Sequence, residues 1–260
     1  MSQSASRILI VVLFSTVIFG CTVKEERDGC PCRLFLDFTS VDLADQAPLL
    51  LSVFSDDGFE FSRMIDYGNY QDTCIIDVPR TDLNVVLWSG AEGYMDEYGL
   101  TIPSGAGCPP VYIHSQNLKA EGEFIYDVVS LKKSYCILNV SLVNSNSVEG
   151  MMVRGNVAGF DKVGNSCPGD FRVYSKVDPS SVEASIFYVP RLNGTSLYLD
   201  VIESDGMVKT FPLHDYVSAF EYDWDEYDLS DLNVLLNYTA AGVSVTIKVW
   251  DEEFVIDVVI

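Results

Sequence analysis

The sequence predicts an all-β protein built from two antiparallel sandwiches in tandem. Apolar residues alternate with other residues over short runs, as at Leu34, Leu36 and Phe38, and a period of two is typical of half-buried strands. Turn signals such as Asp56-Asp57-Gly58 and Asp205-Gly206 separate the runs, because glycine tolerates the positive φ of tight hairpin turns. The length that remains after a leader of 20 residues, out of 260, fits two sandwiches better than one.

The first 21 residues have the pattern of a secretory leader that ends in a lipidation site. Arg7 precedes thirteen mostly apolar residues, 8–20. As a helix they would cover about 20 Å, short of the roughly 30 Å of a bilayer core. A charged start, a short apolar centre and a small-residue exit predict a signal peptide over residues 1–20, outside the fold. Ile18-Phe19-Gly20-Cys21 resembles the lipobox of bacterial lipoproteins, with a bulky Phe19 where a small residue is usual.

Acylated Cys21 would then be the first residue of the mature chain and its only membrane attachment, because no later apolar run is long enough to span a bilayer. The alternative is an ordinary signal peptide cleaved nearby, with Cys21 lost or free. Residues 21–31 form a charged tether, which is expected to be solvated. Within it, Lys24, Glu25 and Glu26 resemble the acidic export tag of surface lipoproteins in oral and gut anaerobes.

The chain is strongly acidic, with a formal net charge of -22 that becomes -23 when Arg7 leaves with the leader. Such a charge excludes binding to nucleic acid or anionic lipid through bulk electrostatics. It favours solubility outside the cell and a basic partner. The 48% of apolar residues can bury a sizeable core, so the chain is not a disordered tail.

Six cysteines remain if Cys21 carries lipid. They permit up to three disulfides in an exported protein, with 15 possible pairings among which the sequence does not choose, or they are reduced and buried. A zinc site would need a C-x-x-C pair or nearby histidines, and the sequence has neither. These cysteines are Cys30, Cys32, Cys74, Cys108, Cys136 and Cys167.

The strand pattern divides at Lys132-Lys133-Ser134, which predicts one sandwich over 32–131 and a second over 135–260. Expected strands in the first are 34–38, 49–55, 58–64, 74–78, 83–88 and 124–131. Expected strands in the second are 135–143, 171–177, 184–189, 197–203, 232–238, 243–250 and 254–260, with residues 144–150 as a polar loop. Local phrases recur in the two halves at different offsets, so the chain is not a simple tandem repeat.

Three phrases together resemble the FimB-type fimbrial anchor lipoproteins of oral and gut anaerobes. The first is the lipid cysteine, the short tether and Cys30-Pro31 before a strand. The second is LLLSVFSDDGFEF at 49–61, followed by a Val-Pro turn and LNVVLWSG, and the third spans residues 211–260. The turn Arg80-Thr81-Asp82-Leu83 departs from the family, where a Gly and an aromatic residue are usual.

This resemblance implies two transthyretin-like Greek-key sandwiches and a lipid-anchored protein of the outer membrane at the base of a fimbrium. It implies fimbrillin or another fimbrial subunit as partner, joined by exchange of β-strands. The terminal run FVIDVVI places Phe254, Ile256, Val258 and Ile260 on one face and is largely apolar on both, with Asp257 on the other face, so it is a candidate for exchange. The alternative is that it is an ordinary last strand of the second sandwich.

No catalytic or metal-binding motif is present, and we expect a protein that is not an enzyme and has no cofactor besides the lipid on Cys21. His114 and His214 are expected in loops, solvated or capping, and no nucleophile motif accompanies them. Residues 221–231 gather six carboxylates that suggest calcium, but an EF-hand would need different residues at Tyr227 and Asp228. A solvated acidic loop with Tyr222 and Trp224 packed beneath it is expected instead.

The alternative function is a surface lipoprotein that binds glycans. In this interpretation Trp88, Trp224, Trp250 and some tyrosines form platforms on which sugars stack. Burial of tryptophan is the commoner outcome in sandwiches.

Overall fold

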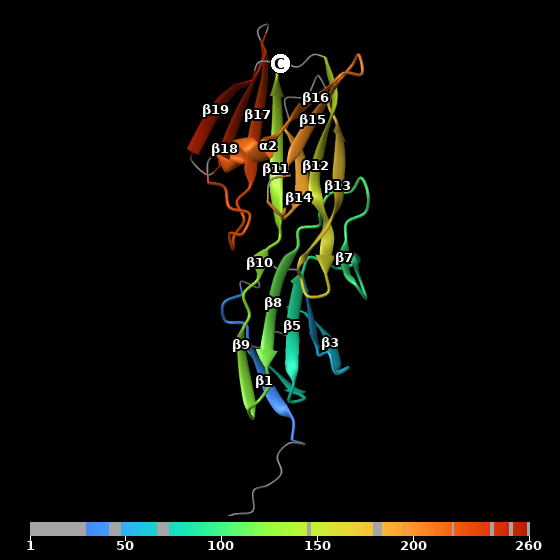
Figure 1. The fold of residues 1–260 in the computed structure, drawn as a ribbon, viewed down its shortest axis with the longest axis vertical. Coiled ribbons are helices and arrows are strands. Elements are labelled where there is room, and N and C mark those ends of the chain that lie inside the picture. Colours follow the sequence, from blue (N-terminus) through green and yellow to red (C-terminus); the bar gives the residue numbers. More distant parts are fainter. Residues whose placement is uncertain are drawn as a thin grey trace, which may run out of the picture.

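The computed structural model describes residues 30–41, 48–66, 73–144, 147–178, 184–194, 196–219, 221–239, 242–249 and 252–258. The leader, Cys21, the export-tag residues Lys24, Glu25 and Glu26, and Ile260 lie outside these ranges. The molecule is elongated, with two β-sandwiches following each other along its longest axis (Figure 1). In the part of the chain that is described, no helix has the length and apolar character needed to cross a membrane. The predicted all-β sandwich fold is confirmed.

The first sandwich contains a sheet of three strands and a sheet of five strands. In order across the first sheet, the strands are β4 (Thr73–Val78), β1 (Cys32–Asp37) and β9 (Phe124–Val128). The second sheet runs β10 (Lys132–Lys133), β8 (Tyr112–Lys119), β5 (Asp82–Ser89), β2 (Leu49–Phe54) and β3 (Glu60–Ile65). Leu34, Leu36, Leu51, Val85 and Leu87 are fully buried in the core of this sandwich.

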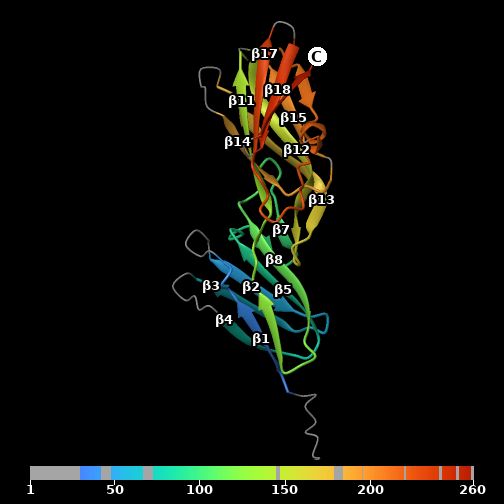
Figure 2. The same ribbon diagram turned by 90° about the vertical axis from the view of Figure 1, so that its left-hand side faces the viewer.

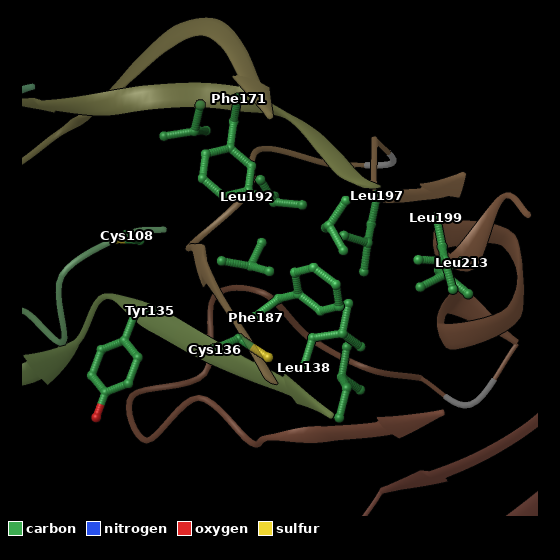
Figure 3. Close-up of a cluster of buried hydrophobic side chains, with 14 of the residues drawn as sticks. Cys108, Tyr135, Cys136, Leu138, Phe171, Phe187, Leu192, Leu197, Leu199 and Leu213 are labelled. Carbon is green, nitrogen blue, oxygen red and sulfur yellow. The ribbon is translucent and has the colours of Figure 1, made fainter. Parts of the chain in front are cut away.

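The second sandwich has the same two-layer plan (Figure 2). One sheet runs β14 (Ser185–Pro190), β11 (Tyr135–Val143), β17 (Leu232–Thr239), β18 (Gly242–Val249) and β19 (Glu252–Val258). The other contains β16 (Val208–Phe211), β15 (Tyr198–Glu203), β12 (Val148–Asp161), β7 (Gly99–Thr101) and β6 (Met95–Asp96), with β13 (Ser166–Lys176) also paired to β12. A short helix that the sequence pattern did not predict, α2 (Leu213–Ser218), follows β16. Its Leu213 lies near Leu199 at one end of the core shown in Figure 3.

The two sandwiches repeat one topology. β1 pairs antiparallel with β4 and parallel with β9, and β11 likewise pairs with β14 and β17. In the other layer the order β3-β2-β5-β8 corresponds to β13-β12-β15-β16. The hairpin β18–β19 is therefore an addition, placed against the strand that is equivalent to β9.

Strand β5 connects the two cores because it is buried on both faces. Val85 and Leu87 face the core of the first sandwich, whereas Val86 and Trp88 belong to the core that continues into the second. The indole of Trp88 meets the ring of Phe160, from β12, edge to face with centroids 6.5 Å apart. Burial on both faces explains why this strand reads as a continuous apolar run instead of an alternating one.

The predicted division at 132–134 is crossed by two segments. The strands β6 and β7, from within the first half, join the sheet of the second sandwich, where β7 pairs with β12 through Gly99, Leu100 and Thr101. In return the β12–β13 turn reaches the first sandwich, where Lys162 Nζ lies 4.6 Å from the ring centroid of Phe54. The junction is thus a shared structure of paired strands and packed side chains.

Among the described strands, the sequence prediction missed β8 and β12, as well as the shorter β6, β7, β10 and β16. It placed no strand at β8 and a polar loop at the start of β12. β8 is polar over Ser115, Gln116 and Asn117 because these side chains are exposed. β12 contains three glycines, which reduce strand propensity. Each glycine is close to a neighbour: a Cβ on Gly155 would lie 2.7 Å from Leu192, and one on Gly159 would lie 2.1 Å from the carbonyl oxygen of Leu100.

We predict that Gly159→Ala destabilises the junction. The added methyl group cannot coexist with the Leu100 carbonyl, so β7 and β12 must separate locally, at a cost of about 1–3 kcal/mol. Thermal unfolding should show a fall in Tm of roughly 2–12 °C. Gly122→Ala is the matched control, because its Cβ would lie 3.5 Å from the nearest atom and should change Tm little. Equal Tm values for both variants would contradict the close packing at β7.

Candidate functional site

The residues predicted for strand exchange lie on β19, the last strand of the five-stranded sheet of the second sandwich. Phe254, Ile256 and Val258 are in register with Ile247, Val245 and Val243 of β18. In the described chain β19 pairs with β18 and with no strand on its other side, as its place at the edge of the sheet in Figure 1 shows. The structure thus places these three residues at an edge.

A second edge, which the sequence analysis did not single out, is β9. The carbonyl oxygen of Glu123 and the N–H of Val129 bond to β1, at Arg33 and Asp37. Because main-chain groups alternate between the two sides of a strand, those of Phe124, Tyr126 and Val128 point away from β1. Within the described residues no other strand pairs there. An unpaired edge is a template for a strand of another chain.

The outer surface of the β4-β1-β9 sheet carries a cluster of aromatic and apolar side chains beside the exposed Arg33–Asp77 ion pair. Phe35 stacks on Tyr126 with ring centroids 4.9 Å apart and contacts Phe124 at 5.9 Å. The exposed fractions are 50% for Phe124, 71% for Tyr126 and 54% for Val128. Ile75, in register with Phe35 on β4, is also exposed. We call these five aromatic and apolar residues the aromatic face, and an exposed cluster of this kind is typical of an interaction surface.

The equivalent surface of the second sandwich is different. There β11 and β17 present asparagines, and Asn139 donates a hydrogen bond to Asn233 at 3.1 Å. A second pair, Asn144 and Asn237, lies at 2.9 Å. Ile186 and Tyr188 of β14 and Leu235 of β17 are also exposed in this sheet. The same topology is therefore stable with a mixed amide and apolar surface, so the particular composition of the aromatic face is not a requirement of the fold.

The predicted placement of the histidines was wrong for both. His114 lies in strand β8 and is buried, with Nε2 2.8 Å from Asp127 Oδ2 of β9. The N–H of Ser130 approaches its Nδ1 at 3.1 Å, so Nδ1 accepts and Nε2 donates in the neutral ring. His214 is buried in α2, with Nδ1 3.2 Å from the Leu197 carbonyl oxygen. His114 therefore links the two sheets of the first sandwich, and neither of its nitrogens is available to activate a nucleophile.

The acidic segment 221–231 is solvated over much of its length and also holds the junction together. Asp223, Asp225, Glu226 and Asp228 are exposed, while Tyr222 and Trp224 pack against the core, as predicted. The exception is Asp231, the last carboxylate of the segment, which takes part in holding the junction together. This departure was not visible in the sequence, because all the carboxylates of the segment look alike there.

Asp231 accepts two hydrogen bonds at the start of the second sandwich. Lys133 Nζ donates to Asp231 Oδ1 at 2.8 Å, and the backbone N–H of Ile137 donates to the same oxygen at 2.9 Å. Nearby, Ser130 Oγ donates to Tyr227 Oη at 2.7 Å. Arg191 donates to main-chain carbonyl oxygens of the acidic segment and of the Lys132-Lys133 strand. These contacts fix the connection between the sandwiches.

All six cysteines in the described chain are free thiols. Burial raises the pKa of Cys136 to about 12 and also raises that of Cys108, so neither is a reactive thiolate at neutral pH. In Figure 3 both belong to the buried cluster. Of the two alternatives left by the sequence, the structure has unpaired cysteines, but only some of them are buried. Cys32, Cys108 and Cys136 are buried, whereas Cys30 is exposed and Cys74 and Cys167 are half-buried.

Of the tryptophans proposed as glycan platforms, Trp88 is fully buried and cannot stack on a sugar. Trp224 is half-buried and packs edge to face on Tyr222 with ring centroids 5.1 Å apart. Trp250 lies outside the described residues. The interpretation of the tryptophans as platforms for glycans therefore loses Trp88.

Solved structures share this fold over most of its length. A candidate polysaccharide-binding protein from Bacteroides thetaiotaomicron has a TM-score of 0.61 and 14% identity, covering 87% of this chain and 98% of its own. The fimbrial anchor protein Mfa2 from Porphyromonas gingivalis has a TM-score of 0.61 and 12% identity, covering 86% and 99%. A candidate adhesin from Bacteroides ovatus has a TM-score of 0.63 and 11% identity, covering 87% and 95%. No protein-family model and no curated protein matches the sequence.

We predict that Asp231→Ala loosens the junction. Lys133, which is nine-tenths buried, and the Ile137 N–H both lose their acceptor, which should cost about 1–3 kcal/mol. Chemical denaturation measures the change. Asp228→Ala removes a nearby exposed carboxylate of the same segment and should leave stability within about 0.5 kcal/mol. If the two variants unfold alike, Asp231 does not hold the junction.

Proposed function

We propose that this chain is a lipid-anchored fimbrial subunit of the FimB type, acting as the anchor or an accessory subunit at the cell surface. The observation that carries the proposal is the shared two-sandwich fold with the fimbrial anchor Mfa2, which extends over 86% of this chain and 99% of that protein. The lipobox-like Cys21 and the phrases of FimB-type anchors support it independently from the sequence. The partners are fimbrillin or other fimbrial subunits, and the role is not catalytic.

The attachment runs through an N-terminal lipid on Cys21 in the outer membrane. Ten residues, 22–31, separate this cysteine from the first strand, β1. Extended, they reach about 33–36 Å, so the first sandwich stays next to the membrane while the second extends away from it. The charged Lys24, Glu25 and Glu26 within this tether are the proposed export signal to the outer face.

Assembly uses two of the open sheet edges, β9 and β19. Strand addition supplies main-chain hydrogen bonds, and alternate side chains give specificity. The β9 edge, with its exposed Phe124, Tyr126 and Val128, is suited to accept a strand of another subunit. The C-terminal strand β19 is suited to donate one, because it lies at a sheet edge and is held by β18 alone in the described chain.

The anchoring role predicts the result of a fractionation. In the producing bacterium, Cys21→Ala should move this protein from the membrane to the medium, and its attached fimbrial polymer should move with it. Immunoblots and electron microscopy of both fractions measure the movement, with Cys30→Ala as a control that keeps the lipidation site. Release of this protein alone, without any polymer, would contradict the anchoring role.

Strand exchange predicts the effect of two edge variants. Tyr126→Pro removes an N–H that points to the open side of β9, so it should block strand addition without breaking an internal bond. Removal of residues 254–260 should do the same at the donor edge. In cells that carry either variant, the polymer should detach from the membrane fraction. In cells that carry Tyr126→Thr, which keeps a strand-forming residue and its N–H, the polymer should stay attached.

Both edge variants must be shown to fold, by circular dichroism and by an unchanged unfolding transition of the first sandwich. If the polymer stays attached to cells that carry one of these folded variants, the edge altered in that variant takes no part in strand exchange. Attachment in both would contradict strand exchange as a whole, while lipid anchoring would still be decided by the Cys21→Ala cells.

A further inference from the structure

A cavity of about 610 Å³ lies between the two sandwiches. In the first sandwich its wall is formed by β8, the end of β9 and the β9–β10 connection. In the second it is formed by the β12–β13 turn, the stretch after β14 and the acidic segment. It exists only where both sandwiches meet, and the contacts of Asp231, Tyr227 and Arg191 hold its walls in place. Its size lies within the range of about 300–1,000 Å³ typical of small-molecule sites.

Hydrogen-bonding side chains on this wall are available to a ligand. Those of Ser115 and Gln116, on β8, and of Asn193, after β14, make no hydrogen bond to another described residue. Asn165, in the β12–β13 turn, uses its amide N–H on Asp161 and keeps its carbonyl oxygen free. Amides and hydroxyls of this kind can donate to and accept from a ligand that carries many hydroxyl groups.

The charges at the cavity offset one another. Burial and the nearby Arg191 charge lower the pKa of Lys132, while Asp225 acts in the opposite direction. His114 and Asp127 are paired to each other, and the guanidinium of Arg191 donates to main-chain carbonyl oxygens. The wall therefore offers no surplus of one sign that would select a strongly charged ligand.

An aromatic ring completes the wall. Tyr227 is 52% exposed, and its hydroxyl is fixed by the hydrogen bond from Ser130. A fixed, partly exposed ring offers a flat apolar surface at little entropic cost. The combination of one such ring with several free amides and hydroxyls matches the chemistry of a sugar, which has an apolar face and a rim of hydroxyls.

We propose that this junction cavity binds a short neutral oligosaccharide. A drug-like apolar ligand is disfavoured because such ligands occupy mainly apolar pockets. A peptide strand is disfavoured because it would pair with an open sheet edge, and this wall is made of side chains. The cavity borders the end of β9, because Asp127 and Val128 contribute to its wall, whereas none of its described lining residues lies on β19. Sugar binding there would be an activity in addition to the proposed fimbrial role and does not depend on that role.

The test is calorimetric titration of the full mature chain, kept in solution by Cys21→Ala, with five neutral trisaccharides. These are maltotriose, xylotriose, mannotriose, cellotriose and N-acetylchitotriose. At least one should bind with a Kd below about 1 mM, an affinity of at least about 4.1 kcal/mol. Gln116→Ala, which removes no internal hydrogen bond, and Tyr227→Ala should each weaken that binding about tenfold, the loss of one ligand contact.

Tyr98→Ala is the matched control, because Tyr98 is 75% exposed and is not among the residues that line the cavity. It should leave the affinity unchanged. The proposal is overturned if none of the five trisaccharides binds, or if binding is as tight in Gln116→Ala and Tyr227→Ala as in the control. Neither result bears on fimbrial anchoring, which is measured in whole cells by the Cys21→Ala fractionation.

Discussion

The structure depends on β5 being buried on both of its faces. One face closes the core of the first sandwich, and the other, through Val86 and Trp88, continues into the core of the second. Buried apolar area contributes roughly 25 cal/mol per Å², so a strand that is covered twice contributes to two cores at once. Two segments cross between the sandwiches: β7 pairs with β12 of the second, and the β12–β13 turn contacts the first. Together they keep the second face of β5 covered. A flexible linker between independent sandwiches would leave it exposed to water.

One topology used twice makes the differences between the sandwiches informative. The first leaves its β9 edge open and carries the aromatic face, while the second covers the equivalent strand with β18–β19 and presents asparagines beside exposed apolar residues such as Ile186 and Leu235. A shared requirement of the fold cannot account for features present in only one copy. In the proposed assembly, they are the features through which the first sandwich contacts another subunit.

The rigid junction also bears on mechanics. In the proposed anchoring role the chain would transmit force between the membrane and the polymer, and paired strands with a continuous core do so better than a flexible linker. The acidic segment adds polar contacts at the same place, because Asp231 accepts hydrogen bonds from Lys133 Nζ and from the backbone N–H of Ile137. The cavity beside it is a consequence of this arrangement, since its polar wall comes from loops that meet only there.

The sequence by itself determined the fold class, most strands and the β2–β3 hairpin, because alternation and turn glycines are local signals. It also carries the lipobox-like leader, which no tertiary contact could reveal. Only the tertiary structure decided the rest. β12 contains glycines because Leu100 and Leu192 approach it from distant parts of the chain, and His114 is buried because Asp127 lies opposite on another strand. Likewise, most carboxylates of the acidic segment are exposed, whereas Asp231, whose side chain is only 39% exposed, accepts hydrogen bonds from Lys133 and Ile137. Contacts between residues far apart in sequence leave no periodic trace, so pattern analysis could not foresee the junction or its cavity.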